Sequence, residues 1–175
     1  MVLEAWLSCR RLYPALKLAI APRHSERAGQ AGETLRAAGV RFRRWSSPEA
    51  GADCLLVDAM GVLPRLYPFA SSSFVGGTLV PVGGHNLLEP ALAGSPVLFG
   101  PHTFHTEHTA RLLESAGCGF RVLDAKDLSR ALEGLLGDRE RSAALGGLAR
   151  RTAQGLQGAT ERTLSFLAEA WPWLR

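Results

Sequence analysis

Short apolar segments alternate with helical patterns along this chain, and that alternation limits the folds open to it. Continuous apolar runs are typical of strands covered on both faces, and helical patterns between them indicate a parallel sheet. The sequence therefore predicts an α/β fold, a Rossmann-like parallel sheet of about six strands with helices on both faces. The runs cover residues 16–21, 40–45, which is more polar, 54–58, 73–75, 96–99 and 120–123.

Helix patterns fill the spaces between these runs. Residues 26–38 have Ser25 as a candidate N-cap and Gly39 as a stop. Asp127 is the expected cap of a second helix, whose leucines and alanine recur at helical spacing. A final amphipathic helix is expected to end at Pro172 and is marked by Leu164, Leu167, Ala168 and Trp171.

Length and composition indicate one domain of 175 residues with an ordinary core, since 46% of the residues are hydrophobic. The net charge of +4 suits an anionic small ligand or membrane surface, without the dense basic stripe of a nucleic-acid binder. The cysteines Cys9, Cys54 and Cys118 form no CxxC pair, and Cys54, which opens an apolar run, is expected to be a buried thiol. The chain opens on a helix-like segment, MVLEAWLSCRRLYP, with no strand before it, which hints at part of a longer protein.

The segment FVGGTLVPVGGHNLLEPALAGSPVLFGP, residues 74–101, is the candidate functional motif. Glycines allow close backbone approach to a ligand, and Pro90 favours a helix start there, with Glu89 at or near its cap. Backbone amides at a helix start suit a phosphate, and a carboxylate suits the two hydroxyls of a ribose. We therefore expect a nucleotide clamp in which Gly84, His85 and Asn86 precede the helix.

Other strand ends carry further candidates for the same site. In a parallel sheet the ligand lies at the carboxyl ends of the strands, where Arg23 and Asp58 are expected beside the Gly-rich loop. Structural explanations stay open for each residue taken alone. Glu89 could cap its helix, Arg23 could form a surface salt bridge, and Asp58 could serve a turn; Gly-rich turns also occur without a ligand.

Several familiar sites are excluded or disfavoured. The chain has no GxxxxGK[ST], no GxGxxG after the first strand and no GxSxG. His102, His105 and His108 would fan widely around a helix, so they are poorly spaced for a metal. We expect His102 at the rim of the site and the other two at the start of a surface helix. No metal and no cofactor is predicted.

Three segments together resemble the lipid A Kdo (3-deoxy-D-manno-octulosonic acid) transferases. The Gly-rich segment resembles the hallmark of that family, APRHSER at residues 21–27 is similar to its PRHPER element, and DAMGVLPRLYPFAS at residues 58–71 is similar to its DTMGEL…Y element. The resemblance implies the C-terminal, donor-binding half of a GT-B glycosyltransferase, in a family that moves Kdo from CMP-Kdo to lipid A precursor during lipopolysaccharide assembly.

The resemblance also implies which residues hold the donor. Pro22 and Arg23 would flank the cytidine monophosphate. Met60, Gly61 and Val62 would line the nucleotide pocket. The ribose and phosphate would be held by the loop and helix start made of Asn86, Leu87, Leu88 and Glu89.

Two positions depart from the family pattern. Leu87 stands where a proline is usual, and Val62 stands where a glutamate is usual, so one side-chain contact is lost. The family's acceptor domain, with its membrane anchor and catalytic base, and its linker strand have no counterpart in these residues. We therefore nominate no catalytic residue in this chain.

The implied enzyme inverts the anomeric centre, acts at the cytoplasmic face of the inner membrane and binds its lipid acceptor through the other domain. This part alone is expected to be soluble and inactive, with no nucleic-acid partner. Two alternatives remain at this point. One is another GT-B transferase or epimerase that uses a UDP-sugar, and the other is a non-catalytic nucleotide-binding module.

Overall fold

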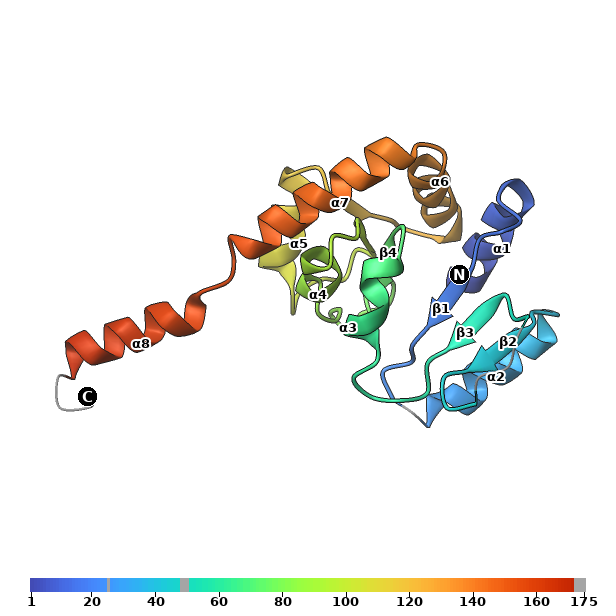
Figure 1. The fold of residues 1–175 in the computed structure, drawn as a ribbon, viewed down its shortest axis with the longest axis horizontal. Coiled ribbons are helices and arrows are strands. Elements are labelled where there is room, and N and C mark those ends of the chain that lie inside the picture. The colour runs from blue at the N-terminus through green and yellow to red at the C-terminus, as the bar shows by residue number, and fades with distance from the viewer. Residues whose placement is uncertain (25, 48–50, 172–175) are drawn as a thin grey trace.

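The structure is a computed structural model that describes residues 1–24, 26–47 and 51–171, with the backbone alone at 159–162. Strands and helices alternate along the chain (Figure 1). The strands are β1 Leu18–Ile20, β2 Phe42–Arg44, β3 Cys54–Leu56, β4 Ser73–Val75, β5 Val97–Phe99 and β6 Gly119–Arg121. The helices are α1 Val2–Leu12, α2 Arg27–Ala37, α3 Leu63–Leu66, the 3-10 turn η1 Tyr67–Phe69, α4 Leu88–Leu92, α5 Glu107–Ser115, α6 Ala125–Leu136, α7 Arg139–Gln154 and α8 Ala159–Ala170.

The strands form two separate parallel sheets of three strands each. Sheet A has the order β1-β3-β2 and sheet B the order β4-β5-β6. Within the described ranges no ladder joins β1 to β4. The expected α/β class and its six strands are confirmed. The expectation of one continuous sheet is corrected to two half-sheets, because β1 and β4 are edge strands that do not pair with each other.

Helix α1 packs against both sheets. Ala5 belongs to a buried cluster with Leu98 of β5 and Leu128 of α6. The next residue, Trp6, belongs to a different cluster that contains Cys54 of β3. Adjacent residues on a helix point about 100° apart, so one short helix supplies apolar side chains to the cores of both sheets.

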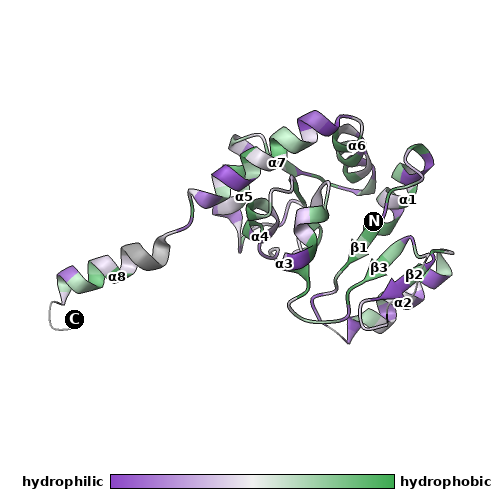
Figure 2. Cartoon of the chain, in the orientation of Figure 1, coloured by the Kyte–Doolittle hydropathy of each residue, from purple (hydrophilic) through white to green (hydrophobic). Residues whose placement is uncertain are grey.

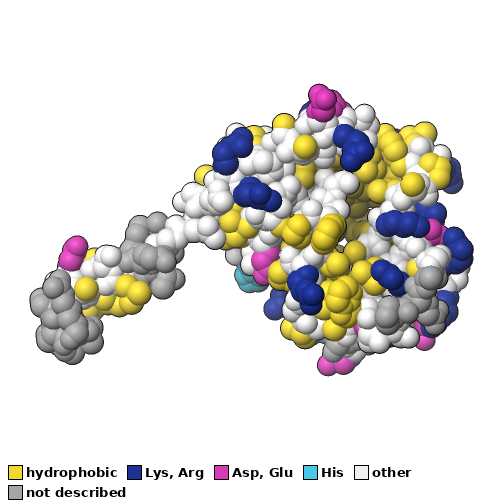
Figure 3. All heavy atoms as spheres, viewed as in Figure 1, with side chains coloured by type: hydrophobic (Ala, Val, Ile, Leu, Met, Phe, Trp, Pro, Cys, Tyr) yellow, Lys and Arg dark blue, Asp and Glu magenta, His cyan; other side chains and the backbone are white. Residues whose placement is uncertain are grey.

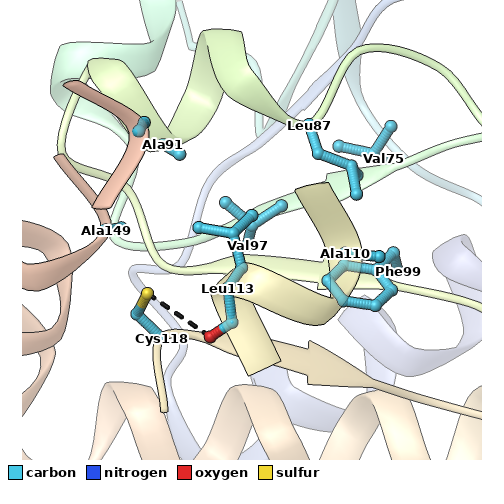
Figure 4. Packing of buried hydrophobic residues seen from close by; sticks show 10 residues of the cluster. Val75, Leu87, Ala91, Val97, Phe99, Ala110, Leu113, Cys118 and Ala149 are labelled. Atoms are coloured by element: carbon cyan, nitrogen blue, oxygen red, sulfur yellow. Dashed lines mark hydrogen bonds between the residues drawn. The ribbon is translucent and has the colours of Figure 1, made fainter. Parts of the chain in front are cut away.

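The core of sheet B is closed on both faces, since Val97 and Phe99 lie in one buried cluster and Leu98 lies in another. All three residues of β5 are fully buried. Figure 4 shows Val97 and Phe99 of β5 between side chains from β4, α4 and α5. The interpretation of a continuous apolar run as a strand covered on both faces therefore holds for β5.

Among the described residues, apolar side chains cover one face of sheet A. Leu18, Cys54 and Phe42 share a register position and pack beneath α1 and α2. One residue further along, Ala19 and Arg43 are exposed and Leu55 is half-buried. Figure 2 shows β1 and β3 as hydrophobic strands on the side of the molecule that faces the viewer.

The helix boundaries confirm some expectations and correct others. Gly39 ends its helix with φ +68°. The N-cap of α6 is Asp124, whose side chain accepts from the N–H of Asp127. Asp127, the predicted cap, is instead the third residue of the helix, and its carboxylate accepts from the N–H of Leu123. The predicted cap Ser25 and the stop Pro172 lie outside the described residues.

Helix α8 extends away from the rest of the chain (Figure 1). Its side chains Leu164 and Phe166 are 60% and 65% exposed. In the described part of the chain, no helix combines the length and hydropathy needed to cross a bilayer.

Replacing Trp6 tests the role of α1 as the shared packing element. Trp6 is only 3% exposed, so Trp6→Ala should lower the free energy of unfolding by about 3–5 kcal/mol. Leu12→Ala, in the same helix at a side chain that is 65% exposed, should change it by less than about 0.5 kcal/mol. Urea unfolding followed by circular dichroism measures both, and equal losses would contradict this packing.

Candidate functional site

The carboxyl ends of the strands in the two half-sheets lie at one edge of the molecule. Loops leave this edge after β1, β3, β4 and β5, as expected for a parallel α/β fold. Contacts between these loops define the candidate site. A surface hollow lies elsewhere, at β2, and is lined by Arg43, Arg44, Trp45 and Leu55.

Thr78 connects the loop after β4 to the end of β5. Its hydroxyl donates to the carbonyl oxygen of Val75 at 2.6 Å and accepts from the N–H of Gly100 at 2.8 Å. Its own carbonyl oxygen accepts from the N–H of His102 at 2.9 Å. Thr78 is fully buried, so these bonds hold the base of the Gly-rich loop in one conformation.

Glycine is required at both positions of the second Gly-Gly pair, because the backbone has positive φ there and neighbouring atoms leave no room for a Cβ. Gly83 and Gly84 have φ values of +97° and +84°. A Cβ atom on Gly83 would lie 2.3 Å from the His105 ring, and one on Gly84 would lie 2.8 Å from Cγ2 of Thr78. Any larger residue here would displace the loop, because L side chains rarely adopt this conformation.

Arg23 and His85 meet across the two half-sheets. The Arg23 guanidinium donates to Nδ1 of His85 at 2.6 Å, which joins the loop after β1 to the Gly-rich loop after β4. Desolvation lowers the pKa of His85, and the charges of Arg23 and His24 lower it further. His85 is therefore neutral at pH 7 and able to accept from Arg23, so that a fixed positive charge stands at this edge.

Asn86 and Glu89 form a second polar pair at the start of α4. The Asn86 amide donates to Oε1 of Glu89 at 3.1 Å, and its oxygen accepts from the N–H of Leu88 at 2.9 Å. The helix begins at Leu88, earlier than the start at Pro90 that was predicted, and runs for five residues. Glu89 therefore lies in the first turn with an exposed side chain.

Leu87 occupies the core rather than the surface. Its side chain is 1% exposed and packs with Val75 (Figure 4). Any contact between Leu87 and a ligand must therefore come from its backbone. The N–H of Leu88 is already bonded to Asn86, which reduces the set of free amides available at the helix start.

The remaining nominated residues lie in the loops after β1 and β3. Pro22 is half-buried and Arg23 is exposed. Met60 is 85% exposed, Gly61 has φ +74°, and the Val62 side chain is 6% exposed. The structure thus places Met60 at the surface and Val62 in the core, and the assignment of all three to a nucleotide pocket stays a prediction.

Two neighbours of the site, Tyr67 and His24, are not among the residues predicted to hold the donor. The turn η1 packs against α4, burial raises the pKa of Tyr67, and the charge of Glu89 raises it further. His24 lies close enough to His85 to lower its pKa. Tyr67 is the tyrosine of the DAMGVLPRLYPFAS segment, but no local sequence pattern predicted that η1 packs against α4.

Asp58 has a structural role. Its carboxylate accepts from the N–H and hydroxyl of Ser46 at 3.0 and 2.6 Å and lies 3.5 Å from the Arg44 guanidinium. These hydrogen bonds lower the pKa of Asp58. Its interpretation as a turn residue, which the sequence left open, fits these contacts.

The three histidines of HTFHTEH are spread apart. His105 packs against Phe104 before α5, and His108 is exposed within that helix. The N–H of His102 bonds to Thr78. Among the described residues, no group of three or more His, Cys, Asp or Glu side chains could hold a metal ion.

Several known proteins with similar sequences are described as 3-deoxy-D-manno-octulosonic acid transferases. No protein-family model matches the chain. The 3-deoxy-D-manno-octulosonic acid transferase of Aquifex aeolicus is 38% identical over 136 residues, which cover 78% of this chain and 38% of that protein. The enzyme of the same name from Bordetella pertussis is 38% identical over 167 residues, which cover 93% of this chain and 39% of that protein.

A solved structure agrees with these sequences. The crystal structure of the C-terminal CMP-Kdo binding domain of WaaA from Acinetobacter baumannii matches with a TM-score of 0.80 and 28% identity, covering 87% of this chain and 81% of that one. This chain is a relative of the Kdo transferases. It corresponds to the C-terminal donor-binding domain of their GT-B fold, as the sequence motifs indicated.

The match extends over only part of each relative. The chain spans about two fifths of the length of the Kdo transferases from Aquifex and Bordetella. What the whole enzymes do therefore carries over to this chain as a proposal.

Thr78→Val removes the hydroxyl while keeping the side-chain volume. The buried N–H of Gly100 would lose its acceptor, so the free energy of unfolding should fall by about 1–3 kcal/mol. Thr78→Ser keeps the hydroxyl and should cost about 1 kcal/mol for the lost methyl group. Chemical denaturation compares them, and a serine variant no more stable than the valine variant would argue against this hydrogen-bonded connection.

A pH titration tests the contact between Arg23 and His85. Because the folded chain disfavours protonated His85, its pKa should lie below the usual value of about 6.5, and folding stability should fall as the pH drops through that value. NMR titration of the His85 ring should show this low midpoint. Arg23→Gln should raise it part of the way, with desolvation remaining. A midpoint that does not respond to Arg23→Gln would show that the two side chains are apart in solution.

Proposed function

We propose that this chain is the donor-binding part of a Kdo transferase that moves Kdo from CMP-Kdo to a lipid A precursor in lipopolysaccharide synthesis. One observation carries the proposal, namely the fold match to a domain described as binding CMP-Kdo. The sequence relatives, described as Kdo transferases, support the same donor.

The contacts at the carboxyl edge suit a nucleoside monophosphate. Arg23 offers a guanidinium, held by His85, to the phosphate. Glu89 offers an exposed carboxylate to the ribose hydroxyls, and the amide of Asn86 orients one of its oxygens. Tyr67 lies near the same carboxylate and is a further candidate to contact the nucleoside.

The proposed reaction inverts the anomeric centre of Kdo. An acceptor hydroxyl attacks that carbon, the bond between the carbon and the phosphate oxygen breaks, and CMP leaves with the bonding electrons. The hydroxyl proton passes to a base that other parts of the enzyme supply. Arg23 stabilises the charge that grows on the departing phosphate, which is electrostatic catalysis by a positioned group.

The acceptor and the membrane belong to the whole enzyme in this proposal. The lipid A precursor would bind through the acceptor domain, at the cytoplasmic face of the inner membrane. The 175 residues alone would bind CMP without transferring Kdo. Turnover of CMP-Kdo by these residues at the rate of an intact transferase would refute that division of roles.

Calorimetric titration of the 175-residue chain tests the donor assignment. CMP should bind in preference to UDP-GlcNAc, and Arg23→Gln and Glu89→Gln should each weaken CMP binding by about tenfold or more, because each removes a charge-assisted hydrogen bond. Arg139→Gln and Glu140→Gln, at exposed positions of α7, serve as matched controls and should bind CMP normally. Preference for UDP-GlcNAc would favour another GT-B enzyme, and no binding of either nucleotide at millimolar concentration would refute the donor site.

A further inference from the structure

Helix α4, which carries Glu89, is too short to hold its own position. It has five residues, Leu88–Leu92, and an isolated helix of that length is not stable in water. Asn86 bonds to Glu89 and to the N–H of Leu88, but these residues all belong to one short segment. The position of the Glu89 carboxylate at the candidate site is therefore set by what packs against α4.

Helix α7 is the main packing partner of α4. Ala91 of α4 and Ala149 of α7 are fully buried in one apolar cluster, and both are labelled in Figure 4. Ala153, one turn further along α7, belongs to the same cluster. The small side chains allow the two helices to approach closely, so a shift of one helix is transmitted to the other through tightly packed atoms.

Gly146 of α7 lies directly against the turn that ends α4. This turn passes through Gly94, which has φ +83° and donates its N–H to the carbonyl oxygen of Ala91 at 2.9 Å. A Cβ atom on Gly146 would overlap the carbonyl oxygen of Gly94. Because that oxygen belongs to the backbone, any larger residue at position 146 would push the end of α4 away from α7.

Arg150, one turn after Gly146, bonds to the last carbonyl groups of α4. Its Nε donates to the carbonyl oxygen of Leu92 at 3.1 Å, and its Nη2 donates to that of Ala93 at 2.8 Å. The last carbonyl groups of a helix have no partner within the helix, and a cation there is favourable. The planar guanidinium meets both oxygens at once and holds the end of α4 against α7.

A continuous series of hydrogen bonds leads from Arg150 to the candidate site. Arg150 bonds to the carbonyl oxygen of Ala93, and the N–H of Ala93 donates to the carbonyl oxygen of Glu89 at 3.2 Å. Glu89 in turn accepts from the amide of Asn86 through its carboxylate. One helical turn separates Arg150's acceptors from Glu89, so a displacement at the end of α4 moves the carboxylate as well.

We propose that Gly146 and Arg150 are positioning residues for Glu89 in donor binding. Gly146 sets how closely α4 approaches α7, and Arg150 holds the last turn of α4. The carboxylate in the first turn is thereby kept where the ribose hydroxyls bind. The proposal rests on the proposed function, because it takes Glu89 as the group that binds the ribose.

The neighbouring arginine provides a matched control. In Figure 3, Lys and Arg side chains lie at the surface over α7, whose sequence includes Arg139, Arg141, Arg150 and Arg151. Arg151 is exposed like Arg150, but among the described residues no hydrogen bond or ion pair joins its side chain to α4. Replacing Arg151 therefore removes the same charge from the same helix and leaves the end of α4 bonded.

Ribose discrimination isolates the part of the affinity that Glu89 supplies. The 175-residue chain should bind CMP about tenfold or more tightly than 2′,3′-dideoxy-CMP, which lacks both hydroxyl groups. Arg150→Met and Gly146→Ala should reduce this preference to roughly twofold or less, and should change the affinity for the dideoxy nucleotide by less than about twofold. Arg151→Met should keep the full preference. Arg150→Lys should restore part of it, because an ammonium also donates to carbonyl groups.

A double-mutant cycle tests whether the effect passes through Glu89. Glu89→Gln should lower the preference by itself, and adding Arg150→Met should then cause no further loss. Two results would overturn the proposal. One is an equal loss of affinity for CMP and its dideoxy analogue in Arg150→Met and Gly146→Ala, which would show that these residues support only the fold. The other is an unchanged preference for CMP in both variants.

A measurement without nucleotide separates this proposal from the donor assignment. Failure of the unaltered chain to bind CMP would refute the donor site, whereas the link from α7 to Glu89 is observed in the free chain by NMR. The side-chain amide resonances of Asn86, which bonds to Glu89, should shift in Arg150→Met and stay in place in Arg151→Met. Identical Asn86 resonances in both variants would show that α7 does not position this part of the site.

Discussion

The packing of α1 against two separate cores is the constraint on which the arrangement of this chain depends. Ala5 and Trp6 are adjacent in sequence, yet each lies in the core of a different half-sheet. Without that helix, the described contacts between the half-sheets would rest mainly on surface loops. The relative position of β1 and β4, and with it the geometry of the carboxyl edge, therefore follows from apolar burial some distance from the site.

The candidate site consists of loops that are anchored to the strand ends and bonded to one another. Thr78 binds the base of the Gly-rich loop to the end of β5. Arg23 and His85 then join that loop to the end of β1. This combination gives a positioned positive charge at the carboxyl edge of the sheets. The similarity to a CMP-Kdo binding domain fits that picture.

The local sequence pattern was sufficient to predict most strands and helices, but not the residues at which the helices begin. All six strands were predicted near their observed positions, because their apolar runs are short and separated by helices. Asp127 was predicted as the α6 cap, but the cap is Asp124; both residues precede the same apolar stripe, and only the hydrogen bond to the N–H of Asp127 identifies the cap. Leu87 was predicted to contact the donor, yet its side chain is buried against Val75, because burial depends on tertiary packing around α4.

The sequence by itself determined the class of fold, the order of its elements and the motifs that relate it to the Kdo transferases, since these depend on local periodicity and residue identity. Only the tertiary structure decided that the strands form two half-sheets, that Tyr67 approaches Glu89 and that Arg23 meets His85 across 62 positions. The physical reason is that strand pairing and loop contacts join residues distant in the chain. Their free energy depends on the packing of the whole molecule, which no local pattern records.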